Sequence, residues 1–124
     1  MPSSEKQNTG RKGEELAVAY LESKGYTILE RNYFFERSEV DLVAYEGQKI
    51  IFVEVKTRTG DGYGAPEDSI TDQKRRNIFK ASEAWLYERK MDGAPVRFDV
   101  ISIRDTKQSA PDIKHFEGAF WYQD

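Results

Sequence analysis

The sequence predicts an α/β or α+β domain in which a β-hairpin leads a sheet that lies between helices. Apolar residues recur at three- and four-residue spacing near residues 13–24 and 71–90, which is typical of helices that bury one face. Runs rich in β-branched and aromatic residues indicate strands at residues 26–33, 39–45, 49–56 and 96–103, with a last extended or mixed segment at 113–122. This order of elements excludes a helical bundle and a β-sandwich.

Length and composition predict a single domain. A chain of 124 residues with 38% apolar side chains has room for one modest core, which we place over residues 10–124, after a flexible tail at residues 1–9 that lacks periodicity. No apolar run approaches the roughly 20 residues needed to cross a bilayer, and the N-terminus is polar. We therefore expect a cytoplasmic protein without a membrane partner.

The residue types restrict the available chemistry. The absence of cysteine excludes disulfides, thiolate nucleophiles and iron–sulfur clusters, and a single histidine excludes a histidine-rich metal site. We expect Asp99 to make a structural hydrogen bond and His115 to be a structural or surface residue. Carboxylate, lysine and hydroxyl groups remain, with any hard metal ion that the carboxylates hold. The net charge of −3 does not exclude nucleic-acid binding, because a phosphate backbone responds to the local patch that it meets.

Each predicted helix has a recognisable end. Gly25 stands where a left-handed residue would stop the first helix. Ser69 or Thr71 can cap the second helix, which follows a loop with three glycines at residues 58–66 that lacks the ending of a Walker phosphate-binding loop. The expected inward stripe of the second helix consists of Ile78, Ala81, Ser82, Trp85 and Leu86.

The predicted hairpin gathers ionisable side chains on one face. If Tyr45 pairs with Ile50, then Asp41 lies opposite Glu54, and if the loop is shorter Asp41 lies on a diagonal of Glu54. Lys56 shares the face of Glu54 because side chains alternate along a strand. Two opposed carboxylates destabilise a sheet unless a positive charge lies between them, and a divalent cation is the obvious candidate.

Residues outside the hairpin extend this pattern. Glu14 continues the apolar stripe of the first helix towards the sheet, where a carboxylate needs a partner, whereas Glu15 falls on the solvated edge. Lys74, Arg75 and Arg58 could form a basic rim for a phosphate backbone, and Tyr63 in the glycine-rich loop could stack on a base. Taken singly, each of these residues has an ordinary structural explanation, such as an exposed ion pair or a solvated helix face.

Several segments together resemble the YraN-like family of small, poorly characterised proteins over about residues 10–120. They are Gly10-x-x-Gly13-Glu14-x-x-Ala17-x-x-Tyr20-Leu21, Gly25-Tyr26, Arg31-Asn32-Tyr33, Glu39-Val40-Asp41-Leu42, Phe52-Val53-Glu54-Val55-Lys56-Thr57-Arg58 and Arg97-Phe98-Asp99-Val100-Ile101. That family is similar to Holliday-junction resolvases and to nucleases of the restriction-endonuclease-like, PD-(D/E)XK fold. The resemblance implies a central mixed sheet flanked by helices. Val40 stands where the motif has proline, and Ser38 where the family usually has glycine.

The resemblance also implies residue roles. Asp41 takes the first acidic position, Glu54 and Lys56 take the (D/E)XK positions, and Glu14 takes the helix glutamate. The expected function is a Mg²⁺- or Mn²⁺-dependent endonuclease acting on DNA, including branched DNA, with Asp41, Glu54, the Val55 carbonyl and Glu14 holding the ion, and with a homodimer matching a symmetric junction. The alternative is a non-catalytic module that binds nucleic acid or a partner and keeps the acidic cluster as a structural ion-pair network.

Overall fold

The chain folds around one five-stranded sheet. The structure is a computed structural model that describes residues 2–59, 70–105 and 110–121. Its elements in chain order are α1 (Pro2–Ser23), β1 (Thr27–Phe35), β2 (Ser38–Glu46), β3 (Lys49–Thr59), α2 (Asp72–Glu88), β4 (Val96–Asp105) and β5 (Asp112–Phe120). The strands lie in the order β1-β2-β3-β4-β5, with β3 and β4 parallel and the other neighbours antiparallel. This mixed sheet flanked by helices confirms the predicted fold class.

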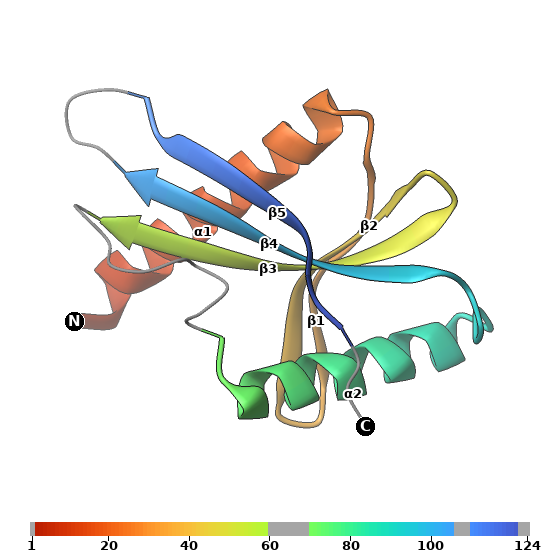
Figure 1. Cartoon of the computed structure of the whole chain (residues 1–124). Helices are drawn as coiled ribbons and strands as arrows, with labels where there is room; N and C mark the ends of the chain where they lie inside the picture. The colour runs from red at the N-terminus through yellow and green to blue at the C-terminus, as the bar shows by residue number, and fades with distance from the viewer. Residues whose placement is uncertain (1, 60–69, 106–109, 122–124) are drawn as a thin grey trace.

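Two apolar clusters lie on the two faces of the sheet, each beneath one helix (Figure 1). Because side chains alternate along β3, Ile50 and Phe52 pack with Trp85 of α2, whereas Ile51 and Val53 pack with Leu21 of α1. The α2 face is rich in aromatic rings, including the stacked pair Phe52 and Phe98 with centroids 5.6 Å apart. Both faces of β3 are therefore covered, which explains its nearly continuous run of apolar residues.

The β2–β3 hairpin has the first of the two predicted registers. Tyr45 pairs with Ile50, and Glu46 pairs with Lys49 around a two-residue turn of Gly47 and Gln48. Both turn residues have positive φ, 58° and 66°, as a tight hairpin turn that follows the strand twist requires. In this register Glu54 of β3 is the position opposite Asp41 of β2, as the first alternative predicts.

The alternation of side chains in β2 is less regular than predicted. Val40 and Val43 belong to the same apolar cluster although they are three positions apart, so strict two-residue alternation fails between them. Asn32 of the neighbouring strand has a φ of 53°, which bends β1 where it runs beside this part of β2. The irregularity lies in the part of β2 that contains Asp41.

The second helix follows the prediction closely. Thr71 is the N-cap, with its hydroxyl accepting the backbone N–H of Lys74 at 3.1 Å. The buried residues of α2 are the predicted stripe of Ile78, Ala81, Ser82, Trp85 and Leu86. As the connection between the parallel strands β3 and β4, this helix is held against one face of the sheet.

The first helix ends as predicted but begins earlier. Gly25 has a φ of 91°, and the N–H of Tyr26 donates to the carbonyl of Leu21 at 3.0 Å, which closes the helix in a Schellman-type cap. The backbone is helical from Pro2, whereas the sequence predicted a flexible tail up to residue 9. Extending a helix that packing has already nucleated costs far less than starting one, so weak periodicity does not stop it. No helix in the described residues is long and apolar enough to cross a membrane.

Gly13 fixes the approach of α1 to β3. A Cβ atom built on Gly13 would collide with the Oγ1 atom of Thr57. Glycine is costly inside a helix, by about 1 kcal/mol relative to alanine, so this close approach gives it a structural reason. The same contact determines how near the next residue, Glu14, comes to the sheet.

Gly13→Ala is expected to destabilise the protein by about 1–3 kcal/mol, because the added methyl group forces Thr57 and α1 apart. In a Thr57→Ala background the clash is gone, and Gly13→Ala should then stabilise by up to about 1 kcal/mol through helix propensity. Thr57→Val keeps the branched side chain and is the matched control that should not reverse the sign. Urea unfolding of the double-mutant cycle measures these terms. A cost that is equal in all three backgrounds would contradict this packing.

Candidate functional site

Asp41 and Glu54 lie where β2 separates from β3. The last paired residues of these strands at this end are Leu42 and Val53. Beyond them Asp41 Oδ2 accepts the backbone N–H of Val55 at 2.8 Å, so a carboxylate replaces the carbonyl that a longer ladder would supply. Asp41 and Glu54 are therefore the next two residues in the predicted register, although strand pairing stops one residue before them, at Leu42 and Val53.

Both carboxyl groups are largely removed from water. Asp41 is 9% exposed and Glu54 is 5% exposed. Burial, followed by the negative charge of Asp41, raises the pKa of Glu54 to about 7. Burial likewise raises the pKa of Asp41, against the lowering effect of the Val55 N–H. The two groups therefore form a coupled acid pair, the arrangement predicted from the hairpin.

Two lysines provide positive charge beside the pair. Lys74 Nζ lies 3.3 Å from Glu54 Oε1, and Lys56 Nζ lies 4.0 Å from the same oxygen. Both ammonium groups lower the pKa of Glu54. The other oxygen, Glu54 Oε2, is buried and has no hydrogen-bond partner. An unpartnered oxygen on a buried carboxylate leaves an acceptor for a further cation or donor.

Glu14 approaches the same site from α1, as predicted. It accepts a hydrogen bond from Asn32 Nδ2 at 2.9 Å, and its charge raises the pKa of Asp41. Glu39 is a fourth acidic neighbour, whose pKa is raised by burial and then by the charges of Asp41 and Glu14. Glu15 is exposed and pairs with Arg31 at 2.6 Å, which confirms the solvated position expected for it.

The donor atoms of this site suit a hard divalent cation. Mg²⁺ and Mn²⁺ prefer carboxylate and carbonyl oxygens, and Mg²⁺ usually keeps several waters with one or two protein carboxylates. Asp41 and Glu54 could supply the carboxylates, Val55 its carbonyl, and Glu14 a contact through water. Within the described ranges no group of three or more acidic or histidine side chains is gathered closely enough to hold an ion by itself. The residues therefore fit an ion that is bound by two carboxylates and whose remaining ligands are mostly water.

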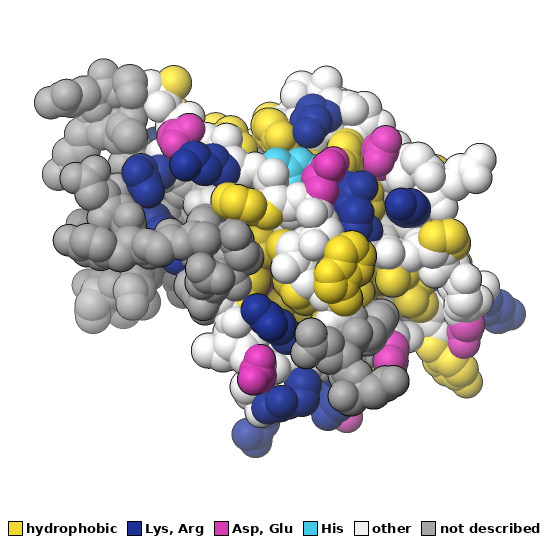
Figure 2. Space-filling model, viewed as in Figure 1, with side chains coloured by type: hydrophobic (Ala, Val, Ile, Leu, Met, Phe, Trp, Pro, Cys, Tyr) yellow, Lys and Arg dark blue, Asp and Glu magenta, His cyan; other side chains and the backbone are white. Residues whose placement is uncertain are grey.

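The residues predicted for the basic rim come from α2, β3 and the segment between them. Lys74 and Arg75 lie in the first turn of α2, Arg58 lies near the end of β3, and Tyr63 falls outside the described residues. Arg75 pairs with Asp72 at 3.9 Å. On the face shown in Figure 2, basic and acidic side chains are interleaved, and no continuous basic stripe crosses this view.

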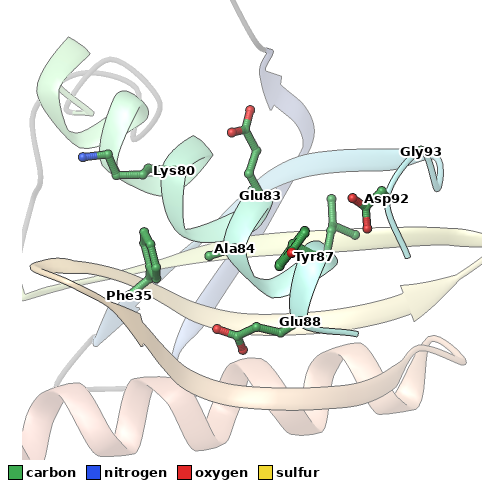
Figure 3. A pocket seen from close by; sticks show the side chains of 9 residues that line it. Phe35, Lys80, Glu83, Ala84, Tyr87, Glu88, Asp92 and Gly93 are labelled. Carbon is green, nitrogen blue, oxygen red and sulfur yellow. The ribbon is translucent and has the colours of Figure 1, made fainter. Parts of the chain in front are cut away.

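A groove of about 770 Å³ lies apart from the acid pair. Figure 3 shows Phe35, Ala84 and Tyr87 around it, with charged side chains at its rim from the C-terminal half of α2. None of the four acidic residues of the hairpin site lines it. The groove and the acid pair are therefore two separate features of the molecule.

Comparison with known proteins establishes the family. The model of the uncharacterised protein family UPF0102 matches residues 13–103, a segment that contains Glu14, Asp41, Glu54 and Lys56. The chain belongs to this family. This confirms the YraN-like resemblance found in the motifs.

Several relatives are similar over nearly their whole length. A UPF0102 protein of Geobacter metallireducens is 48% identical over 92% of this chain and 93% of its own. A UPF0102 protein of Geotalea uraniireducens is 41% identical over 94% of this chain and 92% of its own, and one of Rhodococcus opacus is 43% identical over 90% and 94%. Their names state a family and no activity.

Lys74 is the site residue whose role the sequence analysis missed. It was assigned to the basic rim, whereas its ammonium contacts the buried Glu54. The signal was present, because Lys74 lies four residues before Ile78 and so continues the inward stripe of α2 towards the sheet. The same reasoning that placed Glu14 correctly would have placed Lys74.

A second polar cluster surrounds Asp99 on β4. Its carboxylate accepts two hydrogen bonds from Arg97, each 2.8 Å long, one from the Gly118 N–H at 2.9 Å and one from His115 Nε2 at 2.7 Å. Burial raises the pKa of Asp99, but these hydrogen bonds outweigh it and hold the pKa below its usual value. Asp99 and His115 are therefore structural, as expected. They tie β5 to β4.

The raised pKa of Glu54 predicts how stability depends on pH without metal. Between about pH 4.5 and 7 the native state holds a proton that the unfolded state releases, so the free energy of unfolding should fall as pH rises. Over this pH range the free energy of unfolding should fall by at most roughly 3 kcal/mol. Glu54→Gln should remove most of this decrease, and Glu15→Gln should leave it unchanged. Guanidinium unfolding in EDTA at pH 5 and pH 8 measures it. A slope in Glu54→Gln equal to that of the parent would show that Glu54 titrates normally.

Asp99→Asn is expected to cost about 2–4 kcal/mol at neutral pH, because Arg97 is only 15% exposed and would keep a poorly compensated charge. Glu117→Gln is the matched control, since this carboxylate also contacts Arg97 but is 53% exposed, and it should cost less than about 1 kcal/mol. Because the native pKa of Asp99 lies below its unfolded value, its contribution is lost as pH falls below about 4. Thermal unfolding from pH 7 to pH 3 checks both statements, and similar costs for the two variants would refute them.

Proposed function

We propose that this protein is a metal-dependent endonuclease that hydrolyses phosphodiester bonds in DNA, with branched DNA as the candidate substrate. The observation that supports the proposal most strongly is the buried pair of Asp41 and Glu54, in which one oxygen of Glu54 has no partner. Two coupled carboxylates are an expensive arrangement for stability alone. Their cost has a ready explanation if they bind a cation during function.

Each residue of the site has a proposed role. Asp41 and Glu54 would hold Mg²⁺ or Mn²⁺ together with the Val55 carbonyl, and Glu14 would act directly or through water. When bound, the ion supplies a water of lowered pKa and neutralises charge on the scissile phosphate. Lys56 is partly exposed and lies beside Glu54, so its ammonium can orient the attacking water and stabilise negative charge that develops on the phosphate.

Binding of the DNA backbone is proposed for residues around this centre. Arg75 and Arg58 would contact phosphates on either side of the acid pair, and Tyr63 would stack on a base. A homodimer would present two such sites to a symmetric junction. Phosphate contacts of this kind position the duplex and carry no sequence information, which agrees with a substrate recognised by its shape.

A non-catalytic binding module remains the second candidate function. The observation in its favour is the 3.3 Å ion pair between Lys74 and Glu54, which gives the buried carboxylate a partner within the protein. On this reading the acidic cluster is an ion-pair network that stabilises the fold, and the protein binds DNA or another protein without chemistry. Removal of Glu54 would then alter stability and leave DNA binding unchanged.

Cleavage of labelled DNA separates the two functions. With Mg²⁺ or Mn²⁺ at low ionic strength, the protein is expected to cut four-way or flapped DNA faster than linear duplex, and EDTA should stop the reaction. Glu54→Gln and Lys56→Met should each lower the rate at least about 100-fold, because they remove an ion ligand and a charge that stabilises the transition state. Circular dichroism confirms that the variants fold.

Glu15→Gln is the matched control for this assay. It removes the exposed carboxylate of the residue next to Glu14 and should leave the rate unchanged. Loss of cleavage only in the Glu54 and Lys56 variants supports the nuclease. A protein that binds DNA but cuts none of the three substrates with either ion would contradict it and favour the binding module.

A further inference from the structure

Lys74 enters the acid pair from a fixed point on α2. Its backbone N–H is held by the Thr71 cap at 3.1 Å, while its ammonium reaches Glu54 Oε1 at 3.3 Å. The lysine side chain is 39% exposed, whereas that of Glu54 is 5% exposed. The residue therefore spans from a rigid helix end near the surface to a buried carboxylate, with a flexible four-carbon stem between them.

Lys74 is the principal counter-charge of the pair in the described structure. Its charge lowers the pKa of both Asp41 and Glu54, while Lys56 is 4.0 Å from Glu54. Lys74 occupies Oε1 of Glu54, and Oε2 has no partner. A cation bound to the pair would thus share one carboxylate with an ammonium group that is already in contact with it.

The two cations cannot both stay close to Glu54 without cost. A divalent ion and an ammonium group a few ångströms apart repel each other even in water, and more strongly in a partly buried site, so the ammonium weakens binding of the ion. Because Lys74 is partly exposed, its stem can carry the ammonium outward to water without unfolding α2. The position outside the pair is where the phosphate of a substrate would lie.

We propose that Lys74 is a positioning residue that competes with the divalent cation for Glu54 and, once displaced, binds a phosphate group of the nucleic-acid substrate. In the absence of the ion it balances the charge of the acid pair. When the ion occupies the pair, the ammonium moves outward and binds a phosphate group of the nucleic-acid backbone. This inference rests on the proposed function and adds a specific role for α2 to it.

Competition and phosphate binding predict effects of opposite sign. Removing the charge of Lys74 should strengthen binding of the ion, by about tenfold, because a repulsive cation is lost. It should weaken DNA binding and slow cleavage, because a phosphate contact is lost. A purely structural role for Lys74 would produce neither the tighter ion binding nor this opposition.

The test measures Mn²⁺ affinity and DNA affinity separately on the full chain. Lys74→Met keeps the apolar stem and removes the charge, Lys74→Arg keeps the charge, and Lys80→Met is the control because Lys80 lies on the same helix but pairs with Glu36 at 3.6 Å. Calorimetric titration with Mn²⁺ alone should give a dissociation constant about tenfold lower for Lys74→Met. Lys74→Arg and Lys80→Met should match the parent. Melting curves in EDTA confirm that each variant is folded before titration.

The outcomes distinguish this inference from the proposed function. If the parent binds Mn²⁺ and Lys74→Met binds it equally or more weakly, competition by Lys74 is wrong while the metal site stands. If the parent binds no Mn²⁺ at millimolar concentration, the proposed function and this inference both fail. Tighter Mn²⁺ binding by Lys74→Met together with weaker DNA binding, measured by fluorescence anisotropy with a labelled four-way junction in Ca²⁺, supports the inference.

Discussion

The structure depends on how two buried carboxylates of like charge are held at one point of the sheet. Asp41 and Glu54 lie where β2 leaves β3, and the N–H of Val55 gives Asp41 the hydrogen bond that a paired strand would otherwise have taken. If the ladder continued past this point, the two side chains would be fixed by strand spacing and flanked by paired backbone. The separation of the strands opens this end of the hairpin to side chains from both helices.

The two helices bring charged side chains to the acid pair from opposite faces of the sheet. Gly13 lets α1 lie close enough to β3 for Glu14 to influence Asp41, and the Thr71 cap fixes the first turn of α2 so that Lys74 reaches Glu54. The aromatic cluster under α2 and the aliphatic cluster under α1 hold both helices in place. The packing of the core thus determines the electrostatics of the site, since a small shift of either helix would remove one charge from the acid pair.

Local patterns predicted most of the fold. The Thr71 cap and the buried stripe of α2 depend on neighbouring residues, and both lie where the sequence predicts them. The hairpin has one of the two predicted registers, with Tyr45 opposite Ile50, but the additional pair of Glu46 and Lys49 shortens its connection to the two residues Gly47 and Gln48. The helical start of α1 and the break in side-chain alternation between Val40 and Val43 are not predicted from the sequence. The positive φ of Asn32, beside this part of β2, is a local conformation that hydrophobic periodicity does not reveal. For the site, alternation along β3 placed Glu54 and Lys56 correctly. The basic residues around Lys74 indicate a surface position for it, although its spacing of four residues from Ile78 continues the inward stripe of α2; the partner that this stripe reaches, Glu54 on β3, becomes apparent only in the folded chain.

The proposed function requires Asp41 and Glu54 to form a binding site for a divalent cation together. Crystals grown with Mn²⁺ and measured near the manganese absorption edge test this site most directly. One strong anomalous peak is expected within bonding distance of both carboxylates, with the Lys74 ammonium moved away from Glu54. Anomalous maps without a peak at this pair, in crystals where Lys74 still contacts Glu54 at saturating Mn²⁺, would contradict it.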